Sequence, residues 1–248
     1  MAKVGGEPSL HGANAQKRSR RAARSSVPRH SVRATRTAGQ KMRSRLLDAA
    51  SALFKTHGLN GTSISAIASA ADAFPSQVTY YFRTKEALFV EAACRDMLHI
   101  AERAEKAAAR ARTPEAFVGT VADSVVGASG LVLFVEALIL TRQRPDLVPE
   151  VARTIERLHI EGGRAYADKI ARDGSRTHHD PNVAARRFWT IALGTALEGY
   201  ATGRSRAAMA KGMREALGEL AETGSAKDAA APSLHLVSTS GHPSPKST

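Results

Sequence analysis

Apolar residues recur at helical spacing almost without interruption between residues 40 and 223, and this pattern constrains the fold more than any other feature of the 248-residue chain. Its first stripe has the i, i+3, i+4, i+7, i+8 spacing of one buried helix face: Leu46, Ala49, Ala50, Leu53 and Phe54. Glycine and proline divide the pattern into about nine segments of helical length. We therefore expect an all-α fold.

The same pattern divides the chain into four parts. Residues 1–39 are rich in Arg, Ser, Ala and Gly without an apolar period, so we expect a disordered basic tail. Residues 224–248 have low complexity and form a second expected tail. Between the tails, a small head over residues 40–84 precedes a larger helical body over residues 85–223.

Positive charge is concentrated at one end of the chain. The net charge is +13, and residues 1–45 hold twelve Lys and Arg against a single acid, Glu7. Such a patch favours a polyanionic partner, because neutralised phosphates release counterions. An anionic membrane is the competing partner, but the tail has almost no large apolar residues to insert. We favour a solvated tail that adds nonspecific affinity over an arm fixed in the minor groove.

Several features restrict where the protein acts. The longest uncharged apolar run in the middle of the chain, residues 124–135, has 12 residues, whereas a membrane-spanning helix needs about 20. The basic N-terminus lacks the apolar stretch of a signal peptide. The single cysteine, Cys94, excludes an internal disulfide, so we expect a cytoplasmic protein. At Cys94 a buried hydrophobe is favoured over a redox switch.

The sequence carries no signature of catalysis or metal binding. There is no P-loop, no GxGxxG motif and no GxSxG nucleophile elbow. His178 and His179 are adjacent, but no cysteine or third histidine lies near them. We expect a protein that is not an enzyme, with no cofactor and no metal.

Helix start and stop signals divide the head into three helices. The first runs over residues 40–57 and ends at Gly58. Thr62 and Ser63 provide an N-cap for a short second helix, which ends at Asp72. A third helix over residues 75–81 begins with a proline in its first turn. Two short helices joined by a tight turn and packed on an earlier helix form a helix-turn-helix unit.

The third of these helices has side chains suited to the major groove. Gln77 can bond adenine in bidentate fashion, and Ser76 and Thr79 are further polar groups. Three more side chains are placed to contact phosphates: Tyr80, Tyr81 and Lys85.

The head resembles the TetR family of transcriptional regulators at three segments: residues 62–68 (TSISAIA), 78–82 (VTYYF) and 84–88 (TKEAL). The resemblance is close over residues 41–90, and beyond them it extends only to helix number and length. This chain departs from the usual family pattern with Asp72 in place of glycine, Phe74 in place of a capping serine and Thr79 in place of tyrosine. The expected DNA contacts are Arg43, Thr62, Ser63, Pro75, Ser76, Gln77, Thr79, Tyr80, Tyr81 and Lys85.

The resemblance implies that the body is a homodimerisation and effector-binding domain. Its helices are expected from residue 85 to about 112, from 113 with an interruption at 127–130, and over 131–143, 149–172, 181–203 and 205–223. The candidates for the effector pocket are Phe117, Phe134, Glu136, His159, Tyr166 and Trp189, with Leu133, Ala137 and Glu198 beside them. Each of them also suits an ordinary core position, which is the stronger interpretation for any single residue. For Glu136, an arginine such as Arg142 or Arg164 is favoured as partner over a cationic ligand.

The last two helices are expected to pair two subunits. The residues assigned to this dimer interface are Phe188, Ala192, Thr195, Ala196, Gly199, Met209, Met213, Leu217 and Leu220. The same stripes would also suit a core within one chain, and the resemblance is the main reason to favour dimerisation.

The sequence therefore predicts a sequence-specific DNA-binding regulator, a repressor that a small-molecule effector releases from its operator. The alternative is an all-helical ligand carrier or small enzyme whose helix-turn-helix is only structural. The two hypotheses differ at residues 76–85, which are exposed in a DNA-binding protein and covered in a carrier or enzyme.

Overall fold

The computed structural model describes residues 29–174 and 180–226, and in these two intervals every regular element is helical. The all-α expectation is thus confirmed. The elements are α2 (Arg29–Gly61), α3 (Ile64–Ala70), α4 (Pro75–Phe82), α5 (Lys85–Ala108), α6 (Pro114–Val126), α7 (Ser129–Leu140), the 3-10 helix η1 (Pro145–Leu147), α8 (Val148–Asp173), α9 (Pro181–Ala201) and α10 (Arg206–Ala226). His178 and His179, residues 1–28 of the tail expected over 1–39, and residues 227–248 of the tail expected over 224–248 lie outside the described part.

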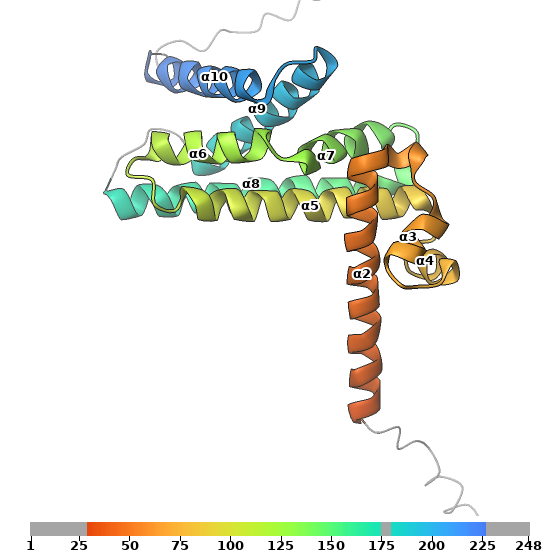
Figure 1. Cartoon of the computed structure of the whole chain (residues 1–248). Helices are drawn as coiled ribbons and strands as arrows, with labels where there is room; N and C mark the ends of the chain where they lie inside the picture. Colours follow the sequence, from red (N-terminus) through yellow and green to blue (C-terminus); the bar gives the residue numbers. More distant parts are fainter. Residues whose placement is uncertain (1–28, 175–179, 227–248) are drawn as a thin grey trace, which may run out of the picture.

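The first helix is longer than the sequence pattern predicted. It begins at Arg29 instead of Gln40, so the expectation of a disordered tail is wrong for residues 29–39. The N-terminal part of α2 projects beyond α3 and α4 (Figure 1). A helix that extends past its neighbours needs no apolar stripe. Residues 29–39 have no such stripe, so the sequence pattern did not predict this part of α2.

The turns and the cap between the three helices of the head lie where the local signals place them. Gly58 has a φ of 67° and interrupts the helical backbone near the end of α2, a conformation that glycine adopts without a steric penalty. The Ser63 hydroxyl accepts a hydrogen bond from the Ala66 amide at the start of α3. Asp72 has a φ of 49° in the turn between α3 and α4, as expected of a left-handed turn residue.

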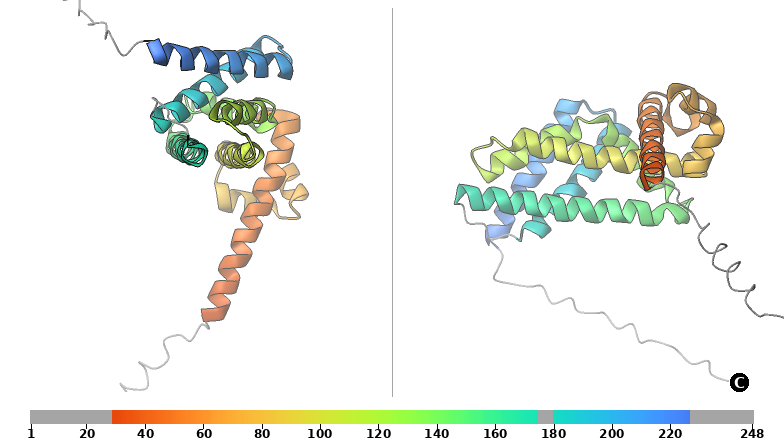
Figure 2. Two further views of the ribbon diagram at one scale, coloured as in Figure 1. Left: turned by 90° about the vertical axis from the view of Figure 1, so that its left-hand side faces the viewer. Right: turned by 90° about the horizontal axis from the view of Figure 1, so that it is seen from below.

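The body is a layered helical bundle attached to the head through α5. Helices α6 and α7 return along α5, α8 lies beside α5, and α10 packs across α6 and α9 (Figures 1 and 2). Because α7 already begins at Ser129, the interruption expected at residues 127–130 is confined to Gly127 and Ala128. Within the described residues no single helix is long and apolar enough to cross a membrane; only α6 and α7 together reach that length, with a bend of 73° between them.

One hydrophobic core runs from the head into the body. It includes Phe54 of α2 and Phe89 of α5, whose rings pack edge to face with centroids 5.0 Å apart. Leu88 and Met97 of α5 are fully buried in the same cluster. Since α5 contributes to both parts of this core, a displacement of α5 is transmitted to the packing of the head.

Candidate nucleic-acid interface and body cavity

Helix α4 presents one buried and one exposed face. Val78 and Phe82, four residues apart, are buried against the head. Pro75, Ser76 and Thr79 are exposed, and the ring of Tyr80 is 81% exposed. The polar face singled out from the sequence is therefore free of intramolecular packing.

Gln77 has a structural role that the sequence analysis did not predict. Its side-chain Oε1 accepts a hydrogen bond from the Phe74 backbone N–H at 2.9 Å, and its own N–H donates to the Phe74 carbonyl at 2.9 Å. Phenylalanine has no side-chain acceptor, so Gln77 completes the cap at the start of α4. This bond uses one of the two lone pairs of the oxygen that bidentate adenine recognition would also need.

Three other residues expected to contact DNA make internal contacts instead. Thr62 is only 3% exposed and donates to the Gly58 carbonyl at 2.8 Å, so its assignment as a DNA contact is wrong. The Lys85 ammonium donates to the carbonyls of Leu59 and Thr62 at 2.8 and 2.9 Å, where it satisfies the end of α2. The third residue is Arg43, whose guanidinium donates to the Glu91 carboxylate at 2.6 Å and lies over the Phe82 ring.

The remaining expected contacts lie close to the exposed face. Ser63 is exposed while its hydroxyl caps α3. Tyr81 is half-buried, and its hydroxyl lies near Gly39 of α2, where an added Cβ would be 3.4 Å away.

The turn before α4 is held by Arg45, which donates to the Ala71 carbonyl at 2.5 Å. This contact joins α2 to the turn across 26 residues, and no local sequence signal indicated it.

Phe74 is the most unusual residue of the head. It occupies the N-cap position of α4 with an extended backbone, φ −89° and ψ 146°. Phe74 is 74% exposed, whereas Phe54 and Phe82 of the head are buried. In the sequence, Phe74 stands out only as a departure from a family pattern.

A polar seam joins α2 of the head to α5 of the body. We define it as three ion pairs: Arg43–Glu91, Asp48–Arg95 and Lys55–Asp96. The Asp96 carboxylate is buried and also accepts from the Ser51 hydroxyl at 2.5 Å. Arg95 bonds Asp48 at 2.8 Å, and its Nε is buried without a hydrogen-bond partner in the described part of the chain.

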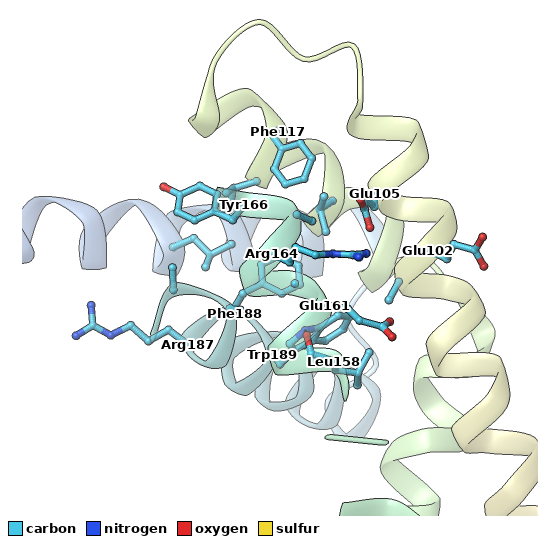
Figure 3. Close-up of a pocket in the computed structure, with 18 of the residues that line it drawn as sticks. Glu102, Glu105, Phe117, Leu158, Glu161, Arg164, Tyr166, Arg187, Phe188 and Trp189 are labelled. Carbon is cyan, nitrogen blue, oxygen red and sulfur yellow. The ribbon is translucent and has the colours of Figure 1, made fainter. Parts of the chain in front are cut away.

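A cavity of about 790 Å³ lies in the body between α5, α6, α8, α9 and α10. Phe117, Tyr166, Phe188 and Trp189 surround the space, and the Arg164 side chain crosses it (Figure 3). The Trp189 indole N–H is satisfied by the Leu158 carbonyl at 3.0 Å, so this ring presents an apolar surface. A volume of this size suits a drug-sized molecule.

Only half of the expected pocket residues line the cavity. Phe117, Tyr166 and Trp189 do, whereas Phe134 is fully buried in the core. The lining residues that were not predicted include apolar ones such as Leu98 and Val121, together with ten ionisable ones: Arg95, His99, Glu102, Glu105, Glu115, Arg157, Glu161, Arg164, Arg187 and Arg214. On isolated amphipathic helices these side chains are typical of a solvated face, and only the assembly of five helices brings them to the edge of one cavity.

Glu136 and His159 lie away from the cavity lining. Partial burial raises the pKa of the Glu136 carboxyl, and no ion pair with Arg142 or Arg164 forms in the described residues. Burial lowers the pKa of His159, and the nearby positive charge of Arg186 adds to this effect. Leu133 and Ala137 are buried in the core, and Glu198 pairs with Arg204. The assignment of these side chains to the effector pocket is therefore wrong.

The residues expected at the dimer interface mostly face the interior of the subunit. The buried ones are Phe188, Ala192, Ala196, Gly199, Met209 and Met213. Gly199 permits close approach of α10, because an added Cβ would overlap the Met209 thioether. Thr195 is partly buried, and Leu217 lines the cavity. The side chain of Leu220 lies outside the described residues. The apolar stripe therefore packs within one subunit. A core within one chain was the alternative interpretation of this stripe.

Cys94 follows the simpler of its two interpretations. Its thiol is 2% exposed, and burial raises its pKa to about 11. The thiolate is the reactive form of cysteine. A buried, protonated thiol is a hydrophobic core group, as the sequence analysis favoured.

Two protein-family descriptions match this chain, and together they cover most of the described residues. Residues 46–92 match the family described as bacterial regulatory proteins, tetR family, and residues 114–218 match a bacterial transcriptional repressor C-terminal family. No curated protein sequence matches the chain. A solved structure from Rhodococcus sp. RHA1, assigned as a transcriptional regulator, has 33% identity and a TM-score of 0.65, covering 73% of this chain and 95% of its own.

Two further solved structures show the same arrangement of helices. A protein of Mesorhizobium loti MAFF303099 assigned to the TetR family has 20% identity and a TM-score of 0.59, over 75% of this chain and 97% of its own. The multidrug binding protein EbrR, complexed with imidazole, has 28% identity and a TM-score of 0.52, over 73% and 90% of the two chains.

Proposed function

We propose a mode of action that proceeds from one premise: this chain belongs to the TetR family of bacterial transcriptional regulators. Two copies pair through their bodies, and each places α4 in the major groove of an operator. The bound dimer represses transcription. A small molecule that enters the body cavity releases it from the DNA, and catalysis has no part in this action.

The exposed face of α4 is the observation that carries the proposal. Ser76, Thr79 and Tyr80 are all exposed, although Val78 and Phe82 on the opposite face are buried. A helix-turn-helix that served only packing would be covered on both faces. The major groove is about 12 Å wide and admits a helix, whose polar side chains then meet the base edges.

Pairing of two subunits is supported by the outer face of α9. Leu193, Leu197 and Tyr200 follow one another at helical spacing, and the last two are exposed. Gly194 lies between them with open space at the position of an added Cβ, which allows close approach of a second helix. A dimer formed here places two α4 helices on one side of the DNA, where successive major grooves recur at about 34–36 Å.

Release by a ligand is supported by the position of α5. One side of this helix lines the cavity with Leu98 and Glu105, and another forms the polar seam with α2 through Glu91 and Asp96. Arg95 belongs to both the cavity lining and the seam. A ligand that prefers a different position of α5 would favour a state in which both heads are displaced. The shift in the equilibrium between the two states can be no larger than the ligand's differential affinity for them.

EbrR, a relative with 28% identity, is described as a multidrug binding protein. Its description supports the body cavity as the ligand site of this chain as well. Aromatic walls of Phe117, Phe188 and Trp189 favour an apolar or aromatic ligand body.

The test is a pull-down of sheared genomic DNA with the full chain, followed by gel shift on the enriched fragments. Wild-type protein should retain a few fragments in excess competitor DNA. The double variant Ser76→Ala/Thr79→Ala should bind those fragments about 5–150-fold more weakly, equivalent to 1–3 kcal/mol for lost base contacts.

Thr56→Ala is the matched control. Thr56 and Thr79 are both exposed, and each hydroxyl bonds the carbonyl four residues earlier, but Thr56 lies on α2. This variant should bind as the wild type does. Equal enrichment of all genomic fragments by wild type and double variant would contradict the proposal.

A further inference from the structure

Phe74 leaves an aromatic ring in solvent at the start of α4. The ring is 74% exposed. Burial of a phenylalanine side chain stabilises a protein substantially, and neighbouring Phe54 and Phe82 are both buried. The described chain leaves most of Phe74 uncovered, so the exposed part of its ring gains contacts only when another molecule binds.

The local structure holds the backbone of Phe74 while its ring stays free. The N-cap position normally carries a side chain that accepts a hydrogen bond from the helix. Here the Gln77 carboxamide bonds the Phe74 N–H from inside the first turn, and Pro75 fixes the next φ. Replacement of the ring alone therefore leaves the start of α4 intact.

The ring stands where an incoming helix first meets the base edges. Recognition helices contact bases through their N-terminal residues, and Ser76 beside Phe74 is also exposed. In the major groove the apolar group on a base edge is the C5-methyl of thymine, and phenylalanine is among the side chains that pack on it. A ring pressed against guanine would instead desolvate the N7 and O6 acceptors without a partner.

We propose that Phe74 is a specificity-determining residue that packs on the C5-methyl group of one thymine in each operator half-site. This inference rests on the proposed function, since it requires that α4 enters the major groove. It predicts a thymine at one fixed position of each half-site, beside the bases contacted by Ser76.

Deoxyuridine provides the test, because it differs from thymidine only by the missing methyl group. Each thymine of a selected operator is replaced in turn in both half-sites, and the Kd of the full chain is measured by fluorescence anisotropy. At one position the wild type should lose about fourfold in affinity per half-site, the value of one buried methyl. Phe74→Ala should bind the thymine and deoxyuridine operators equally.

Two variants separate the contact from a general loss of binding. Phe74→Leu keeps an apolar side chain and should retain part of the methyl sensitivity. Tyr80→Ala removes the other strongly exposed ring of α4, and it should leave the methyl sensitivity at this thymine unchanged. Circular dichroism of each variant confirms that the head is folded.

The outcomes distinguish this inference from the proposed function. If the wild type selects a DNA site but is indifferent to deoxyuridine at every thymine, the Phe74 contact is refuted and the function stands. An equal methyl sensitivity in wild type and Phe74→Ala also refutes it. If the wild type shows no preference among DNA sequences, both fail. If a protein partner covered the Phe74 ring in the absence of DNA, the ring would belong to a protein-binding surface. That result would overturn the proposal.

Discussion

Gln77 shows how residue type can indicate one task for a side chain while the structure reveals a second one. The sequence placed it on the exposed helix of the head, but its carboxamide oxygen is bonded to the Phe74 N–H. Residue type alone could not distinguish these roles, since glutamine is suited both to adenine and to a helix cap. What decides the role of Gln77 is the residue three positions earlier, because Phe74 at the cap position has no side-chain acceptor.

This assignment gives a prediction for two substitutions at one position. Gln77→Ala leaves the Phe74 N–H without its acceptor and should lower the free energy of unfolding by about 0.5–2 kcal/mol. Its affinity for all DNA sequences should fall together, because the whole helix loses its anchor. Gln77→Glu keeps an acceptor and should unfold like the wild type. Urea denaturation measures the free energy of unfolding of both variants. If Gln77→Ala were as stable as the wild type and changed only the base preference, Gln77 would be a base-contacting residue.

Thr62 and Lys85 illustrate the same limit at the residue scale. Both belong to segments that resemble a DNA-binding signature, and both satisfy backbone carbonyls near Gly58. Their pattern was visible in the sequence, but their partners are up to 26 residues away. The long-range hydrogen bonds of Lys85 cannot be predicted from periodicity.

Among the elements, the end of α4 stores backbone strain. Arg83 has φ 65° and ψ −52°, and the Thr84 N–H donates to the Phe82 carbonyl at 2.7 Å, which closes a γ-turn. This conformation is unfavourable for a residue with a Cβ. It reverses the chain between α4 and α5 within two residues.

Arg83→Gly should therefore stabilise the protein by about 0.5–1.5 kcal/mol, the relief of strain less the extra entropy of glycine in the unfolded chain. Arg103→Gly, an exposed arginine inside α5, should destabilise it by about 1 kcal/mol. Thermal unfolding measures both changes. Destabilisation by both substitutions would show that the turn is not strained.

The polar seam between α2 and α5 gives a second prediction at this scale. Asp96 is buried and accepts from Ser51 and Lys55, so Asp96→Ala leaves two donors without an acceptor and should cost about 2–3 kcal/mol. Asp48 is 68% exposed in its pair with Arg95, and Asp48→Ala should cost at most about 1 kcal/mol. Chemical denaturation compares them, and equal costs would contradict the buried role of Asp96.

Helix existence was predictable from the sequence, because glycine, proline and capping residues act locally. Ser63, Thr113 and Asp180 each cap the helix that follows. The sequence missed the N-terminal extension of α2, which has no buried face to reveal it. It also placed the α9 stripe at a dimer interface, since one apolar face cannot indicate whether its partner is in the same chain.

At the scale of the whole molecule, the body cavity offers an optical signal. Trp189 is the single tryptophan of the chain and lines the cavity. The probe 1-anilinonaphthalene-8-sulfonate should quench Trp189 emission by energy transfer at one saturable site per chain. Ala101→Phe, which fills part of the cavity, should weaken binding several-fold; Ala152→Phe, on an exposed part of α8, should not. Equal binding by both variants would place the probe elsewhere.

The cavity itself lay beyond sequence reasoning. Its aromatic residues were among the candidates, but its charged lining comes from five helices whose polar faces look solvated when each is taken alone. The head, the body and the cavity are connected by α5, and this connection is the physical basis of the proposed switch.

Dimethyl sulfate footprinting of the selected operator tests the central claim most directly, because the reagent methylates guanine N7 in the major groove and adenine N3 in the minor groove. With two outward α4 helices, the bound protein should protect guanine N7 in two patches about 10 bp apart on one face of the duplex. Adenine N3 between the patches should stay reactive. Protection of adenine N3 alone, or of a single patch, would contradict the account.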